Sequence, residues 1–132
     1  MIEIRHKETG TVLHCVDAES LQGACLQEAN LGGADLDGLD LQGADLQGAN
    51  LQEGQLRDAN LQNARLQDAF LYRARLQRAI LEGASLQGAD LRYALLFGAR
   101  LKGARFDAWT RFPYGFAPEK HGCVREETAP PG

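Results

Sequence analysis

Residues 41–60 read LQGADLQGANLQEGQLRDAN, and a Leu stands at every fifth position of this stretch. The spacing runs without a break from Leu21 to Leu101, and Phe106 takes the next place, so eighteen consecutive places hold seventeen Leu and one Phe. The residue two positions before each place from Leu26 onward is Ala with two exceptions. This array decides the fold, and the rest of the chain is interpreted around it.

A period of five fits neither an α-helix nor a flat strand. Five residues advance an α-helix by about 500°, so Leu at this spacing would share no helical face. Side chains on a flat strand alternate with a period of two, so successive Leu would point to opposite sides. Every Leu can point inward only if the chain bends once per repeat, because the bend resets the alternation. The spacing therefore predicts a solenoid whose coils are joined by parallel hydrogen-bond ladders.

Five segments match the unit Ala-Asp/Asn-Leu closely, and they begin at Ala34, Ala44, Ala49, Ala59 and Ala89. On these residues the chain resembles the pentapeptide-repeat proteins. The resemblance implies an all-β fold, a right-handed quadrilateral β-helix with four repeats in each coil. Counting on this basis gives four columns of inward Leu.

The chain outside the repeats divides into capping segments. We expect residues 1–18 to form an N-terminal capping hairpin, 19–108 the β-helix, 109–124 a C-terminal cap and 125–132 a disordered tail. The hairpin prediction rests on the alternating Ile2 and Ile4 before a turn sequence. A cap would cover the ladder edges that a first or last coil otherwise exposes. Aromatic residues cluster after the repeats, so we expect an aromatic C-terminal cap.

Two residues break the Ala pattern. Leu39 is larger than Ala, so we expect overpacking and a local distortion at this position. Gly54 lacks the Ala methyl group. Gln residues fall in two outward columns, one starting at Gln22 and the other at Gln27, and stacked amides can bond to one another along the axis.

Composition limits the classes of protein. No apolar run reaches the ~18 residues of a membrane helix, and the N-terminal sequence lacks the apolar core of a signal peptide, so we expect a cytoplasmic protein that contacts no membrane. The three Cys form no spaced pair, so we expect reduced thiols. Net charge is −4, and the charges are unevenly distributed. The charged residues of segment 28–58 are mostly acidic, whereas those of segment 65–105 are mostly basic. Drift of the composition as the repeats diverge is one explanation of this asymmetry. Head-to-tail contact between molecules, or electrostatic steering of a charged partner, is the other.

No arrangement of residues indicates catalysis. His6, His14 and His121 lie outside the repeats without metal-ligand spacing, and the periodic Gly residues form no phosphate loop. A solenoid filled with Leu also has no concave pocket. We therefore predict that the protein is not an enzyme, with no catalytic residue, no cofactor and no metal site.

One surface feature differs from the rest of the repeats. Outward positions are polar before residue 70, and several are aromatic or apolar afterwards. Clusters of aromatic residues with Arg are typical of the centres of protein interfaces. The predicted interaction patch consists of Phe70, Tyr72, Arg73, Arg92, Tyr93, Leu95 and Phe97. Alternatively, residues 109–118 fold back and cover these side chains.

Three functional interpretations remain open at this point. The first is a non-catalytic interaction or scaffold module with an unknown protein partner, in which the patch could also be a homodimer surface. The second is a DNA mimic, since some proteins of the family that this chain resembles bind type II topoisomerases such as gyrase. The basic segment 65–105 weakens such mimicry, and we expect no binding of nucleic acid itself. The third is a near-consensus or engineered repeat without a selected partner.

Overall fold

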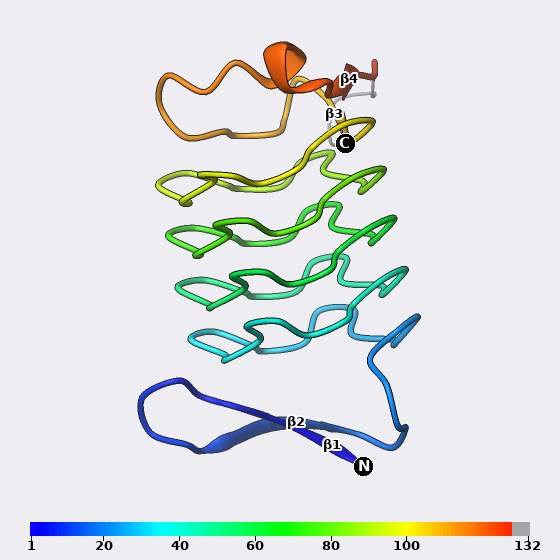
Figure 1. Cartoon of the computed structure of the whole chain (residues 1–132), viewed down its shortest axis with the longest axis vertical. Coiled ribbons are helices and arrows are strands. Elements are labelled where there is room, and N and C mark those ends of the chain that lie inside the picture. The colour runs from blue at the N-terminus through cyan, green and yellow to red at the C-terminus, as the bar shows by residue number, and fades with distance from the viewer. Residues whose placement is uncertain (128–132) are drawn as a thin grey trace.

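The structure, a computed structural model, describes residues 1–127 as a stack of coils between an N-terminal hairpin and a C-terminal segment (Figure 1). These residues contain no α-helix. The named elements are β1 (Ile2–Arg5), β2 (Val12–Val16), β3 (Arg105–Phe106), the 3-10 helix η1 (Pro118–His121) and β4 (Val124–Arg125). The predicted β-helix is confirmed, and its coils are held by single bridges rather than by long strands.

Each repeat contains one tight turn after its Leu. The N–H of Ala24 donates to the carbonyl oxygen of Leu21 at 3.1 Å, and the same bond recurs along the repeats. The second turn residue has a positive φ, both at Gly and at larger residues such as Arg73 (57°) and Tyr93 (60°). This is the pattern of a type II turn, which favours Gly because Gly has no Cβ. The turn supplies the bend that the spacing predicts.

Coils repeat every twenty residues, as the parallel bridges from Asp45 to Arg65 and from Arg65 to Ser85 show. The N–H of Asp45 donates to the Ala24 carbonyl at 2.9 Å, and the N–H of Leu46 donates to the Arg65 carbonyl at 2.7 Å. These bonds form four ladders, which we name after their first Leu: the Leu21, Leu26, Leu31 and Leu36 ladders. The Leu36 ladder, for example, contains Leu36, Leu56, Leu76 and Leu96.

The core is the stack of Leu and Ala side chains inside the coils. Leu31 to Leu91 are fully buried, and the Ala residues of the middle coils are buried with them. Leu96 is the exception among the inward Leu from Leu21 to Leu101, since it is only partly buried. Its position at the end of its ladder explains the difference, because no further coil covers it there.

The N-terminal hairpin lies against the first coil. Strands β1 and β2 pair in antiparallel fashion, and Ile4 of β1 packs into the core with 1% of its surface exposed. The N–H of Asp35 donates to the Arg5 carbonyl at 2.8 Å, and the N–H of Lys7 donates to the Gly33 carbonyl at 2.9 Å. The hairpin therefore takes the place of a preceding coil on the Leu36 ladder.

The C-terminal segment departs from the five-residue count. Asp90 bridges to Arg111, which is twenty-one residues later. The other coil-to-coil bridges join residues twenty apart, so this coil is one residue longer than the others. The loop that absorbs the extra residue is held by Asp107, whose Oδ1 accepts N–H bonds from Trp109 (2.9 Å) and Thr110 (3.1 Å). Phe112 then takes the place that a Leu would occupy, with its ring centroid 5.4 Å from that of Phe106.

Two sequence predictions are wrong. Leu39 overpacks nothing, because it is 36% exposed at the edge of the first coil, and its turn keeps the usual hydrogen bond to Leu36. Arg125 and Glu126 are ordered as well, since Arg125 belongs to β4 and the Glu126 N–H donates to the Phe106 carbonyl at 2.7 Å. Glu127 is exposed and belongs to no strand, and the other residues of the predicted disordered tail, 128–132, lie outside the described residues.

Candidate interaction surface

The predicted patch residues lie on two ladders and on the corners beside them. Phe70 projects outward from the Leu31 ladder, where it bridges to Asn50 and Asp90. Leu95 projects from the Leu36 ladder, and Phe97 lies on the corner that follows it. Tyr72, Arg73, Arg92 and Tyr93 occupy the corner between these two ladders, rather than a flat face. The seven residues thus extend from the Leu31 ladder around one corner to the corner that follows the Leu36 ladder.

Four of these residues form a compact cluster, which we call the Tyr–Arg corner: Tyr72, Arg73, Arg92 and Tyr93. The two Tyr rings meet edge to face with centroids 5.4 Å apart. The Arg73 guanidinium lies 5.4 Å from the centroid of the Tyr72 ring and 5.8 Å from that of Tyr93, and Arg92 lies 5.5 Å from Tyr72. Cation–π contacts of this kind stabilise an Arg side chain over an exposed ring by about 0.5–1 kcal/mol.

The two Arg of this corner differ in their charge partners. Arg92 donates from Nε and Nη2 to the carboxylate of Asp90, at 2.9 and 2.8 Å. These hydrogen bonds lower the pKa of Asp90 below its ordinary value and raise that of Arg92. Arg73 makes no ion pair within residues 1–127. Arg73 is therefore the positive charge of this corner that faces solvent without an ion pair among these residues.

The C-terminal segment does not cover the patch. Phe97 is 84% exposed, Tyr93 66% and Phe70 46%, so the alternative in which residues 109–118 fold over them is wrong. Instead this segment adds exposed aromatic surface of its own at Trp109 and Tyr114. The sequence analysis assigned these two residues to the C-terminal cap, because they belong to the aromatic cluster that follows the repeats.

The segment also forms the wall of two shallow grooves. One groove, of about 290 Å³, is lined by Arg92, Tyr93, Phe112 and Tyr114. The other, of about 380 Å³, lies between the end of the Leu36 ladder and the loop from Pro113 to Phe116. Tyr114 borders both grooves and is fully exposed, so the aromatic surface is continuous from the Tyr–Arg corner to Phe97.

Ion pairs on the corner after the Leu36 ladder join successive coils. Arg57 donates to the Asp37 carboxylate at 2.6 Å, and Arg78 donates to Asp58 at 2.9 Å. The hydrogen bond from Arg78 lowers the pKa of Asp58. Each pair joins residues twenty apart, so part of the acidic half of the chain is neutralised by Arg from the next coil.

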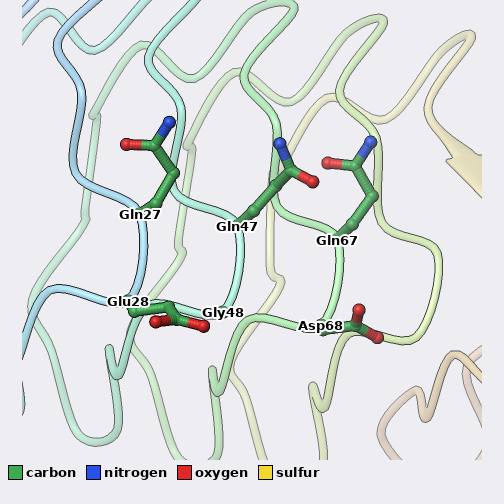
Figure 2. Close-up of a pocket in the computed structure, with 6 residues that line it drawn as sticks. All are labelled: Gln27, Glu28, Gln47, Gly48, Gln67 and Asp68. Atoms are coloured by element: carbon green, nitrogen blue, oxygen red, sulfur yellow. The ribbon is translucent and has the colours of Figure 1, made fainter.

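A polar groove of about 340 Å³ lies on the corner that follows the Leu26 ladder, and Figure 2 shows its lining residues. The Gln27 and Gln47 amides both donate to the Asp45 carboxylate, at 2.7 and 3.1 Å, rather than to each other. The expected amide-to-amide stacking is therefore wrong for these two residues, because a carboxylate is the stronger acceptor. No group of three or more His, Cys, Asp or Glu within residues 1–127 is arranged to hold a metal ion.

These features define the class of protein: a parallel β-helix solenoid built of five-residue repeats with one aromatic, Arg-containing edge. The chain belongs to the pentapeptide-repeat family, since the family model, described as pentapeptide repeats in eight copies, matches residues 20–53, 55–92 and 75–108. Proteins of this family fold as right-handed β-helices. The resemblance to the pentapeptide-repeat family, predicted from the Ala-Asp/Asn-Leu units, is thus confirmed.

Two similar solved structures come from cyanobacteria. The chain is 42% identical to alr5209, a pentapeptide repeat protein from Nostoc Pcc 7120, with a TM-score of 0.76 over 77% of this chain and 84% of that one. It is 36% identical to Rfr23, a pentapeptide repeat protein from Cyanothece 51142, with a TM-score of 0.70 over 83% and 78% of the two chains. Neither similarity assigns an activity.

A third solved structure is much less similar. The plasmid-mediated fluoroquinolone resistance protein QnrB1 is 14% identical, with a TM-score of 0.24 over 84% of this chain and 88% of that chain. A score this low carries no argument about function. Comparison with curated proteins gave no match. Within residues 1–127, no helix has the length and apolar character needed to cross a membrane.

Proposed function

We propose that this protein is a non-catalytic interaction module that binds a protein partner through its aromatic edge. The observation that carries the proposal is the Tyr–Arg corner, where the Arg73 guanidinium is held beside two Tyr rings and makes no ion pair within residues 1–127. Exposed Phe70, Leu95 and Phe97 extend this surface on both sides. Tyr, Phe and Arg are enriched at interface centres, whereas the middle coils present mainly polar side chains.

The test compares the wild-type protein with a triple variant in which Phe70, Tyr72 and Phe97 are changed to Ser. All three side chains point away from the core, so the variant is expected to keep the circular-dichroism spectrum of the wild type. We expect it to lose the capture of partners from a lysate, or to change its mass in solution if the partner is a second copy. A matched control changes Gln42, Gln52 and Gln62, which lie on earlier corners, to Ser. Unchanged mass and unchanged capture in the patch variant would reject the proposal.

We also propose the finer architecture: a right-handed, four-sided β-helix over residues 19–108, closed by the hairpin of residues 1–18 and the aromatic segment of residues 109–124. Burial of Ile4 supports the first cap. The stacked rings of Phe112 and Phe116, with centroids 5.2 Å apart, support the second. Exposed, unpaired thiols at Cys15 and Cys25 support a reducing compartment such as the cytoplasm.

Mimicry of DNA toward a topoisomerase is the alternative, and the charge distribution disfavours it. Residues 65–105 carry eight basic and three acidic residues, whereas a DNA mimic needs a continuous negative surface. A gyrase supercoiling assay separates the two functions. Inhibition or protection of the enzyme that survives the triple Ser substitution would support mimicry over the interaction patch.

A further inference from the structure

The last coil ends in an unpaired ladder edge. Elsewhere in the Leu36 ladder, the N–H groups of Leu76 and Arg78 donate to Leu95 and Phe97 of the next coil, both at 2.9 Å. The equivalent N–H groups one coil later, of Leu96 and Gly98, make no hydrogen bond to any of residues 1–127. The same holds for the carbonyl of Ala94, whose counterpart Ala74 accepts the N–H of Leu95 at 3.0 Å.

Two other ladders, the Leu26 and Leu31 ladders, differ in this respect, because the C-terminal segment adds a strand to each of them. On the Leu26 ladder, the N–H of Val124 donates to the Ala104 carbonyl at 2.8 Å. On the Leu31 ladder, the N–H of Arg111 donates to the Ala89 carbonyl at 2.9 Å. The chain thus adds a further strand to two ladders and leaves the ends of the Leu21 and Leu36 ladders without one, and only the Leu36 end borders a groove with an apolar wall.

The core beneath this edge is also incomplete. Leu36, Leu56 and Leu76 are fully buried, whereas Leu96, the last Leu of the same ladder, is only partly buried. Leu96 lies in the groove of about 380 Å³, whose opposite wall is formed by Pro113, Tyr114 and Phe116. A side chain placed in this groove would stack on Leu96 as Leu96 stacks on Leu76.

We propose that an extended, acidic segment of the partner protein adds to the Leu36 ladder in this groove, as a parallel strand with one large apolar side chain over Leu96. The proposal rests on the proposed function and specifies how the partner binds. Strand addition satisfies unpaired ladder groups, and a pocket for an alternate side chain gives selectivity. Pairing parallel to the edge follows from the direction of every coil-to-coil bridge in the structure.

Charge favours an acidic occupant over a neutral or basic one. Arg100 follows the edge, is exposed and makes no ion pair within the described part of the chain. Arg73 lies one coil before the other end of the edge, beside the Tyr93 ring of the Tyr–Arg corner, and it is equally without such a pair within residues 1–127. Carboxylates on both sides of the apolar residue would therefore meet unpaired guanidinium groups.

The chain itself supplies a suitable probe. Residues 32–41, GGADLDGLDL, form the first strand of the Leu36 ladder, and they carry three Asp and no basic residue. A fluorescently labelled peptide of this sequence should bind the full-length protein, and fluorescence anisotropy measures its affinity. By analogy with the coils, the peptide N–H of Asp35 donates to the Ala94 carbonyl, whereas the N–H of Leu36 points away from the protein.

Two modified peptides test the ladder directly. N-methylation at Asp35 should weaken binding about tenfold, because it removes a hydrogen bond and leaves the Ala94 carbonyl unpaired. N-methylation at Leu36 is the matched control and should change the affinity much less. The peptide with Leu36→Ser should bind about tenfold or more weakly, since it removes the apolar side chain from the groove. Hydrogen exchange at the Leu96 and Gly98 amides should slow when the unmodified peptide binds.

Several outcomes would overturn strand addition. One is the absence of binding at about 1 mM peptide, and another is equal weakening by the two N-methylated peptides. Tighter peptide binding after removal of residues 128–132 would assign the groove to the chain's own terminus. A dimer that the peptide dissociates in sedimentation would assign it to a second copy. If the peptide fails while the triple Ser variant still loses its partner, strand addition is wrong and the proposed interaction function stands.

Discussion

The middle coils, residues 41–90, and the last coil, residues 91–106, are built from the same repeat and end in different environments. Leu56 is fully buried between the coils above and below it, whereas Leu96 on the same ladder has a coil on one side only and remains partly exposed. The comparison teaches that a repeat does not bury its own Leu, because the next coil does so. The end of the repeat array is therefore the part of the molecule that can bind a further strand.

Substitution of Leu56 and Leu96 by Ala should separate the two regions most clearly. We expect Leu56→Ala to lower the free energy of unfolding by about 2–5 kcal/mol, since it leaves a cavity between two packed coils. Leu96→Ala should cost less than half as much, because its side chain already meets the groove. Urea unfolding followed by circular dichroism measures both. Equal losses would show that the end of the ladder is as well packed as its middle.

Two Gly residues at corners of the first coil give the next largest difference. Gly33 and Gly38 both have φ near +70°, so an Ala at either position is strained by about 1–2 kcal/mol. A Cβ at Gly33 would also collide with the His6 ring of the hairpin, whereas a Cβ at Gly38 would meet nothing within 4 Å. Gly33→Ala should therefore destabilise the protein more than Gly38→Ala, as thermal unfolding of both variants can measure.

An Ala at Gly54 should strengthen the middle coils. Gly54 does not have a positive φ, and its ladder neighbours Ala34 and Ala74 hold an Ala in the equivalent turn. We expect Gly54→Ala to stabilise the protein by about 0.4–1 kcal/mol, through the smaller entropy of the unfolded chain. Ala74→Gly is the matched control and should destabilise by a similar amount. A loss of stability in Gly54→Ala would mean that the contact of the new Cβ with the Leu51 carbonyl, at 3.0 Å, is not tolerated.

The smallest expected effect concerns acid stability. The hydrogen bonds from Arg92 hold the pKa of Asp90 below its ordinary value of 3.8. A lowered pKa in the folded state stabilises the fold above about pH 4, and this stabilisation is lost as the pH falls through the lowered value. Arg92→Gln should therefore raise the pH of acid unfolding slightly.

Arg78→Gln on the middle coils is the comparison for this variant. It removes the analogous partner of Asp58, whose side chain is 55% exposed against 18% for Asp90. Exposed ion pairs are screened by water and salt, so we expect a smaller shift than for Arg92→Gln. Acid titrations followed by circular dichroism give the midpoints of both variants. A larger shift for Arg78→Gln would contradict the expectation that the less exposed Asp90 pair contributes more to acid stability.

Much of the fold could be predicted from the sequence because one geometric requirement repeats along the chain. A Leu at every fifth residue can be buried only by a turn in every repeat, and the bond from Ala24 to Leu21 is that turn. The extra residue before Arg111 could not be predicted in this way. It depends on Asp107 accepting three backbone N–H groups, from Gly88, Trp109 and Thr110, and no periodicity indicates such a contact.

The candidate surface was predicted only in part, for a related reason. Phe70, Tyr93 and Phe97 occupy outward positions of the count, so their exposure follows from the same periodicity. Tyr114 lies beyond the last repeat, where the period no longer assigns inside and outside. Leu39 shows the converse error, because its position in the count is correct but the coil that would enclose it is absent beneath it.

The corner residue with positive φ has a wider consequence. Its backbone conformation is the same whether the side chain is that of Gly, Glu, Asn, Arg or Tyr, as Glu53, Asn63, Arg73 and Tyr93 illustrate. The backbone fold is therefore largely independent of the outward side chains. Selection can substitute these side chains without changing the Leu and Ala residues of the core. One sequence of inward Leu and Ala can in this way carry very different recognition surfaces through evolution.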